Sequence, residues 1–228
     1  MGHIEKNLDR LQQEIHAAAH RSGRKPEEVR LIAVTKNVSI ASIEEAIAAG
    51  VTTVGENRVQ ELKNKIHQIH TPVQWHMIGT LQSNKVKYIY DKVDLIHSLD
   101  RISLAMAIQK YARLLGRPIS CLVEVNVAQE DSKEGLKVEE VPAFLRQVSQ
   151  LEGIAVQGLM TMAPYTEKPE EVRWVFQRLR ELSHEVTESN FNGVTMKELS
   201  MGMSNDFKIA VEEGSTMVRV GTAIFGEP

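Results

Sequence analysis

Short apolar runs alternate with longer amphipathic stretches along the whole chain, and this alternation limits the possible folds more than any other feature. Eight runs are mostly rich in Val, Ile, Leu or Met and bounded by Gly, Asn, Ser or Pro, as expected for buried parallel strands. The runs lie at 31–35, 53–55, 75–79, 95–99, 119–127, 154–162, 199–202 and 217–221. The intervening stretches have apolar residues at helical spacing, such as Ile40, Ile43 and Ile47. A further amphipathic helix is predicted at about residues 4–22, before the first strand.

Eight strand–helix units in a chain of 228 residues predict an α/β fold, a single (β/α)8 TIM barrel that spans residues 1–228. The main alternative is an open, doubly wound sheet, which would be expected to carry a glycine-rich nucleotide loop. No GxGxxG or Walker sequence follows any of the predicted strands. The barrel is therefore the favoured architecture.

The charge balance and the hydropathy pattern exclude several classes of protein. The chain has 27 Lys and Arg against 30 Asp and Glu, a net charge of -3, which argues against nucleic acid as a partner. No apolar run approaches the ~18 residues of a membrane span, and the first ten residues lack the apolar core of a secretion signal. The single cysteine, Cys121, cannot form an internal disulfide. A cytoplasmic protein without a membrane partner is expected.

The histidines do not predict a metal site. His16 and His20, and likewise His67 and His70, are spaced for one helix face, but neither pair has a third ligand at a matching distance in the sequence. They are interpreted as solvated side chains. His76, within the third predicted strand, is interpreted as a hydrogen-bonded core or mouth residue.

In a barrel of this kind, functional residues belong at the carboxyl ends of the strands, and phosphate sites frequently follow strands seven and eight. Ser204 precedes a predicted helix at 207–213, so it is a candidate N-cap beside free backbone N–H groups. Gly221 and Thr222 follow the eighth strand and offer a closely approaching backbone and a hydroxyl donor. These residues predict either a capped helix and a tight turn or an anion site.

Two cationic residues share the side-chain parity of the barrel interior. Lys36 follows a buried run and has the parity of Ile32. Either it is desolvated, so that its neutral amine can form a Schiff base with a carbonyl, or it emerges into water. Arg219 is predicted to point inward, either paired with Glu124 or facing a ligand, or both. An aldehyde-reactive lysine, an anion site and an inward arginine match the parts of pyridoxal 5′-phosphate (PLP).

Several long motifs resemble those of the pyridoxal phosphate homeostasis protein family. They include LIAVTK at 31–36, GENRVQE at 55–61, WHMIG at 75–79, LQSNK at 81–85, LSMGMS at 199–204 and GSTMVRVGTAIFG at 214–226. The resemblance covers nearly the whole chain. It implies a PLP-binding barrel similar to the N-terminal domain of alanine racemase.

The resemblance also implies a role for six residues. Lys36 would carry PLP as a covalent aldimine, Ser204, Gly221 and Thr222 would surround the phosphate, Arg219 would lie near the ring nitrogen, and Asn57 would lie near the cofactor. These are the predicted site residues. No catalytic residue and no metal ligand is predicted.

The resemblance further implies a monomer that holds PLP and related B6 vitamers, supplies PLP-dependent apo-enzymes and helps to balance amino-acid and keto-acid pools. An arginine at the pyridine nitrogen disfavours its protonation and weakens the electron sink that robust turnover requires. The alternatives are a PLP-dependent amino-acid racemase with Tyr165 as second base, and a cofactor-free Schiff-base aldolase. Lys85, Lys87 and Lys133 are expected near the mouth, as solvated charges or as contacts for the phosphate or a recipient enzyme.

Overall fold

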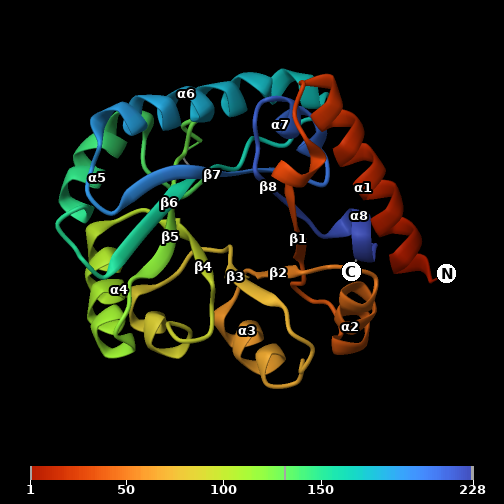
Figure 1. Ribbon diagram of the computed structural model, residues 1–228, viewed down its shortest axis with the longest axis horizontal. Coiled ribbons are helices and arrows are strands. Elements are labelled where there is room, and N and C mark those ends of the chain that lie inside the picture. Colours follow the sequence, from red (N-terminus) through yellow and green to blue (C-terminus); the bar gives the residue numbers. More distant parts are fainter. Residues whose placement is uncertain (1, 131, 227–228) are drawn as a thin grey trace.

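Eight parallel strands form one closed barrel, in which each strand pairs with its neighbours in sequence and the last strand pairs with the first. The computed structural model describes residues 2–130 and 132–226; residues 1, 131, 227 and 228, which the predicted domain includes, lie outside this range. The strands surround a central axis, and the helices form an outer ring (Figure 1). The α/β barrel expected from the sequence is confirmed.

The strands and helices alternate as expected. The strands are β1 (Arg30–Val34), β2 (Thr53–Glu56), β3 (Gln74–Met77), β4 (Leu95–Leu99), β5 (Ile119–Glu124), β6 (Ile154–Met160), β7 (Val194–Met203) and β8 (Met217–Val220). The α-helices are α1 (His3–Arg21), α2 (Ile40–Ala48), α3 (Val59–Ile66), α4 (Ile102–Leu115), α5 (Val141–Val148), α6 (Arg173–Ser189), α7 (Phe207–Glu212) and α8 (Thr222–Phe225). Short 3-10 helices are η1 (Pro26–Glu28), η2 (Ser83–Tyr88), η3 (Val138–Glu140) and η4 (Pro169–Val172). The predicted additional helix is α1, which packs against α7 and α8 (Figure 1).

The apolar side chains divide into two cores according to strand parity. One small cluster fills the barrel interior and contains Ile32, Leu95, Leu122, Met160 and Met217. The larger cluster lies between the strands and the surrounding helices. Because alternate residues of a strand face opposite sides of the sheet, the inner set fixes which residues further along each strand face the mouth.

Most predicted strand limits differ from the structure by one or two residues, and two differ by three or more. β7 begins at Val194, five residues before the predicted run, because its first half is a partly exposed, alternating segment rather than an apolar one. β5 ends at Glu124 rather than at 127, and Val125 forms an isolated bridge with Leu136. The first difference arises because an exposed strand lacks the apolar signature of a buried one, and the second because Val125 and Val127 are buried and apolar although they lie outside the strand.

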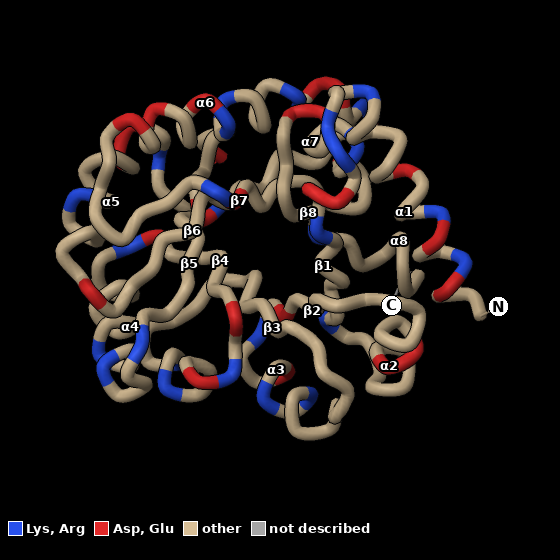
Figure 2. Tube along the Cα trace, viewed as in Figure 1, with Lys and Arg blue, Asp and Glu red and all other residues tan. Residues whose placement is uncertain are grey.

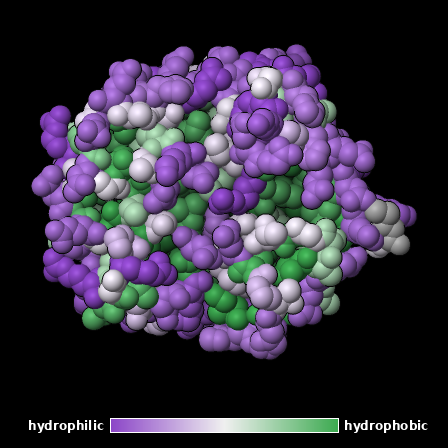
Figure 3. Space-filling model, in the orientation of Figure 1, coloured by the Kyte–Doolittle hydropathy of each residue, from purple (hydrophilic) through white to green (hydrophobic). Residues whose placement is uncertain are grey.

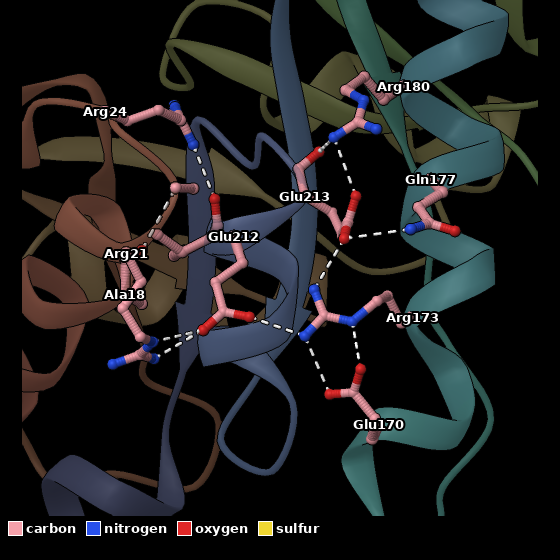
Figure 4. Close-up of polar contacts among 11 residues, drawn as sticks. Ala18, Arg21, Arg24, Glu170, Arg173, Gln177, Arg180, Glu212 and Glu213 are labelled. Carbon is pink, nitrogen blue, oxygen red and sulfur yellow. Dashed lines mark hydrogen bonds and ion pairs between the residues drawn. The ribbon is translucent and has the colours of Figure 1, made fainter.

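A network of ion pairs ties α1, α6 and α7 together on the outside of β8 (Figure 4). The Glu212 carboxylate lies 2.7 Å from both Arg21 on α1 and Arg173 on α6. The buried Glu213 carboxylate accepts from Arg173 at 2.7 Å and from Arg180 at 2.9 Å. This network fixes α7, which follows the loop at the carboxyl end of β7.

Charged residues lie mainly on the outer helices (Figure 2). In the same orientation, the periphery is largely hydrophilic, and hydrophobic residues gather in hollows inside the ring of helices (Figure 3). None of the helices in residues 2–130 and 132–226 combines the length and the apolar character that a membrane-spanning segment requires.

Replacement of Glu213 by Gln should destabilise the protein, because Arg173 and Arg180 then lose a shared and largely buried anionic partner. We expect the free energy of unfolding to fall by about 1–3 kcal/mol, measured by urea denaturation at pH 7. Glu181→Gln is the control, since the Glu181 carboxylate meets Arg178 at 3.5 Å on the exposed surface of α6. For Glu181→Gln, the free energy of unfolding should fall by less than about 0.5 kcal/mol. An equal fall for the two variants would contradict the stabilising role assigned to Glu213.

Candidate functional site

The pairing of β1 with β8 brings the predicted lysine next to the predicted phosphate loop. Ala33 pairs with Val220, so the residues that follow each strand leave the barrel at the same edge. Lys36 lies three residues beyond Ala33, and Gly221 and Thr222 directly follow Val220. The amine of one segment and the backbone of the other therefore meet at the barrel mouth.

The neighbouring strands add the remaining predicted residues. Met203 pairs with Arg219, so Ser204 leaves β7 beside β8, and Asn57 directly follows β2. A cavity of about 530 Å³ opens at this part of the mouth. The predicted site residues all line it: Lys36, Asn57, Ser204, Arg219, Gly221 and Thr222.

Lys36 emerges at the mouth, which decides between the two alternatives that the sequence left open. Its side chain is exposed, and its amine makes no hydrogen bond or ion pair with any residue in the described ranges. In its neutral form, a primary amine without a competing partner is available to attack a carbonyl carbon.

A buried ion pair fixes the loop on both sides of this lysine. Lys65 donates to the Glu56 carboxylate at 2.7 Å and to the Thr35 carbonyl oxygen at 2.6 Å. The Glu61 carboxylate accepts from the backbone N–H of Asn37 at 3.0 Å. Sequence reasoning did not find the ion pair between Lys65 and Glu56. The spacing of Glu61 and Lys65 by four residues on α3 was a usable signal that Lys65 has a carboxylate partner. The backbone on either side of the reactive amine is thereby held, while the amine itself stays free.

Unpaired donors gather where the sequence allowed an anion site. The backbone N–H groups of Ser204, Gly221 and Thr222 donate no hydrogen bond to other residues in the described part of the chain. A Cβ atom on Gly221 would lie 3.1 Å from the carbonyl oxygen of Val34, tighter than most Cβ contacts. Glycine therefore keeps the backbone accessible here, and the free N–H groups can receive an anion.

Ser204 is not the N-cap of the following helix, which corrects the expectation from the sequence. Residues 204–206 form a turn, and Asp206 occupies the N-cap of α7. The Asp206 carboxylate accepts from the backbone N–H of Met203 at 2.6 Å. Ser204 lines the cavity, and its hydroxyl has no hydrogen-bond partner among the described residues.

Asn57 brings an unpaired acceptor to the cavity wall. Its Oδ1 atom is buried and has no hydrogen-bond partner among the described residues. A Cβ atom on Gly79 would lie 2.3 Å from the Asn57 carbonyl oxygen, so only glycine permits the loop after β3 to approach this closely. A buried amide oxygen without a partner is costly unless a ligand supplies a donor.

Arg219 points into the barrel, as expected, but its partners differ from the predicted pair. It donates to the Ser200 hydroxyl at 2.5 Å and to the Thr161 carbonyl oxygen at 2.8 Å, and no ion pair of the described residues joins it to Glu124. Burial, reinforced by the charge of Asp100, raises the pKa of Glu124 to about 7, which makes this carboxyl a weak anionic partner. Burial lowers the pKa of Arg219 to about 10, so the guanidinium remains charged at neutral pH.

Two histidines extend this contact across the barrel interior. His97 Nδ1 lies 3.0 Å from the Ser200 hydroxyl, and His97 Nε2 lies 3.0 Å from His76 Nδ1. His76 is therefore a hydrogen-bonded core residue, which agrees with one of its two interpretations. His97 and Ser200 were missed, because each lies in an apolar run and inward parity was their only signal.

Tyr165 lies at the rim of the cavity with 84% of its surface exposed, as expected for an aromatic residue in a proline-flanked loop. The next residue fixes this loop, since Asn205 donates from Nδ2 to the Thr166 carbonyl oxygen at 2.7 Å. The rim segment is thus joined to the loop after β7.

The three lysines expected near the mouth do not line the cavity. Lys85 and Lys87 belong to η2, and their amines lie 5.9 and 4.8 Å from the centre of the Tyr88 ring. Lys133 is an exposed residue in the loop after β5. Lys85 and Lys87 lie on a short 3-10 helix that follows β3, where the sequence had indicated a loop.

Among the described residues, neither the cysteine nor any group of potential metal ligands forms a second centre. Cys121 is fully buried in β5, and burial raises the pKa of its thiol. Across residues 2–130 and 132–226, no three His, Cys, Asp or Glu side chains are grouped so that they could hold a metal ion.

The carboxyl group of Glu124 should make stability depend on pH. Its pKa of about 7 in the folded protein exceeds the ordinary value of 4.5, so the native state binds this proton more tightly than the unfolded chain. Its contribution to the free energy of unfolding therefore falls as pH rises from about 4.5 to 7. Glu124→Gln should stabilise the protein by about 1–3 kcal/mol at pH 8 and change it little at pH 4, measured by urea denaturation. A loss of stability at pH 8 would contradict this burial penalty.

Comparison with known proteins gives a consistent result over the full length. The family model described as alanine racemase, N-terminal domain, matches residues 6–228. The pyridoxal phosphate homeostasis protein of Aquifex aeolicus is 44% identical over 223 residues, which is 97% of each chain. The protein of the same name from Escherichia coli is 36% identical and covers 99% of this chain and 97% of its own.

Solved structures agree with the sequence comparison. PipY of Synechococcus elongatus, determined with PLP bound, is 36% identical and has a TM-score of 0.84, covering 98% of this chain and all of its own. Alanine racemase of Corynebacterium glutamicum is 14% identical with a TM-score of 0.72, covering 97% of this chain and 62% of its own, which shows a shared fold alone.

Proposed function

Because the chain belongs to the pyridoxal phosphate homeostasis protein family, we propose that it holds PLP at the mouth of its barrel and takes part in controlling the supply of this cofactor. The observation that carries the proposal is the cavity itself. It combines one unbonded lysine amine, a set of unpaired backbone donors and a buried arginine. PLP presents an aldehyde, a phosphate and a pyridine nitrogen, one group for each of these features.

Lys36 forms the covalent bond in this proposal. Its amine would condense with the aldehyde with loss of one water molecule, so that a carbon–nitrogen double bond would join the lysine to the cofactor. Hydrolysis would consume one water molecule and restore both the free amine and the aldehyde. The exposure of Lys36 and the fixed backbone around it favour this residue over the buried Lys65, whose amine is occupied by Glu56 and Thr35.

The remaining predicted residues would bind and orient the cofactor. The free N–H groups of Ser204, Gly221 and Thr222, with the two hydroxyl groups, would hold the phosphate. The unpaired Oδ1 of Asn57 would accept a hydrogen bond from the bound molecule. Arg219 would place a guanidinium N–H against the ring nitrogen.

The charges at the cavity favour storage over catalysis. When bound, PLP can act as an electron sink for carbanions, most strongly when a carboxylate keeps its ring nitrogen protonated. No Asp or Glu of the described residues lines this cavity, and the inward cation is Arg219. A cation at this place disfavours protonation of the nitrogen. The chain would therefore keep the aldehyde bonded to an amine without directing it into rapid turnover.

The same bond would serve transfer. PLP and related vitamers that enter the mouth would be held and then passed to PLP-dependent apo-enzymes. By controlling this supply, the protein would also help to balance amino-acid and keto-acid pools. The six residues that would hold the cofactor come from one chain. A monomer is therefore sufficient for the proposed function.

Lys36→Ala should abolish covalent PLP binding. The purified protein with PLP should show the visible absorption of a lysine imine, and borohydride should fix the cofactor mass on Lys36, as located by peptide mass spectrometry. In Lys36→Ala, the visible band and the labelled peptide should disappear, and affinity for PLP should fall at least about tenfold. Lys85→Ala is the matched control, since Lys85 is an exposed lysine outside the cavity. Label on another lysine in the unmodified protein would overturn the assignment.

Turnover of amino acids should be negligible. We expect assays of the PLP-loaded protein with a panel of L- and D-amino acids to give racemisation rates no greater than those of free PLP with the same amino acids. The competing proposal is a racemase that uses Tyr165 at the rim as its second base. A fast rate that Tyr165→Phe abolishes would favour the racemase and contradict the carrier.

A further inference from the structure

A hydrogen-bonded chain crosses the barrel interior below the cavity. It runs from Arg219 on β8 to Ser200 on β7, from there to His97 on β4, and from His97 to His76 on β3. The separations along it are 2.5, 3.0 and 3.0 Å. All four side chains are at most 4% exposed. The inside of such a barrel is normally filled by branched apolar residues, so a continuous polar chain calls for a function.

The chemistry of the donors gives this chain one direction. Arg219 can only donate, so the Ser200 oxygen accepts from it and the Ser200 proton is free to go to His97 Nδ1. His97 then carries its own proton on Nε2 and donates to Nδ1 of His76. In the opposite direction, His97 would donate to Ser200 and leave the Ser200 proton without an acceptor among the described residues.

Both imidazoles have to be neutral for this direction to hold. Burial, reinforced by the charge of Arg30, lowers the pKa of His76 to about 3. Burial, reinforced by His76, Arg219 and Arg30, lowers the pKa of His97 well below its ordinary value. The groups that face the pair from β1, β3, β4 and β8 thus all disfavour a second proton, and the chain stays intact at neutral pH.

We propose that His97 and Ser200 are positioning residues, which hold Arg219 so that its guanidinium faces the ring nitrogen of bound PLP. The proposal rests on the function proposed above. Ser200 and the Thr161 carbonyl oxygen accept from the two terminal nitrogens of the guanidinium, and this fixes the plane of the group. His97 in turn fixes the Ser200 hydroxyl, and His76 fixes the ring of His97.

The decisive comparison is between PLP and its 1-deaza analogue, in which a C–H group replaces the ring nitrogen. Both molecules carry the aldehyde and the phosphate, and a contact to the nitrogen is an interaction that only PLP can make. The unmodified protein should bind PLP more tightly than the analogue. His97→Leu and Ser200→Ala should each weaken PLP binding about tenfold, leave the analogue within about twofold, and shift the pH midpoint of the visible absorption of the PLP complex.

Two variants of β4 control for general disturbance of the interior. His97→Asn keeps an acceptor close to the place of Nδ1 and should restore PLP affinity to within about threefold of the unmodified protein. Leu95→Ala opens space two residues earlier on the same inner face, in the apolar cluster. It should lower the melting temperature without changing the preference for PLP over the analogue.

The outcomes separate the two proposals. Labelling away from Lys36, or equal affinity of the unmodified protein for the two molecules, contradicts the proposed function of Lys36 or of Arg219. Labelling at Lys36 with a preference that His97→Leu and Ser200→Ala leave unchanged overturns only the positioning role.

The ring protons can also be read without PLP and without any variant. Long-range ¹H–¹⁵N NMR spectra of the cofactor-free protein at pH 7 should show His97 and His76 as neutral imidazoles protonated on Nε2. A His97 protonated on Nδ1, or on both nitrogens, would overturn the proposed direction even if the variants failed to fold.

Discussion

The parallel pairing of β1 with β8 is the contact on which the arrangement of the site depends. It closes the barrel, and at the same edge it places Lys36 beside the loop formed by Gly221 and Thr222. A shift of this pairing by two residues would move one side by roughly 6.6 Å, at about 3.3 Å per residue. Such a shift would separate the amine from the backbone donors. Closure of the fold and assembly of the cavity are thus the same event.

The interior of the barrel holds apolar and polar side chains next to one another. Ile32 of the apolar cluster pairs with Arg219, and Leu95 pairs with His76. The hydrogen bonds among Arg219, Ser200, His97 and His76 all have neutral acceptors. A hydroxyl, an imidazole or a carbonyl oxygen can be buried at a lower free-energy cost than a carboxylate. Glu124 illustrates the cost, since burial raises the pKa of its carboxyl to about 7. The guanidinium is therefore held firmly without being neutralised.

The sequence predicted the barrel and the convergence of the site, and it missed the contacts that hold the site in place. Strand periodicity suffices to orient Lys36 and Arg219, because parity along a strand fixes the side of the sheet. The partners of Arg219 lie 19 and 58 residues away in sequence, and periodicity along one strand does not contain such contacts. The N-cap is at Asp206 because residues 204–206 form a turn before the helix, and periodicity does not indicate where a turn ends. The buried role of Lys65 was hidden because an amphipathic helix ordinarily exposes its lysines.

Hydrogen bonds and an ion pair hold the rim of the cavity on two sides. Beside Tyr165, Asn205 donates to the Thr166 carbonyl oxygen. Beside Lys36, the ion pair between Lys65 and Glu56 holds the loop after β1. Within the described residues, these two contacts hold both sides of the cavity mouth in place. In the proposed function, release of the cofactor would require cleavage of one carbon–nitrogen bond and loss of the phosphate contacts, and a competing amine could speed that release by taking over the aldehyde.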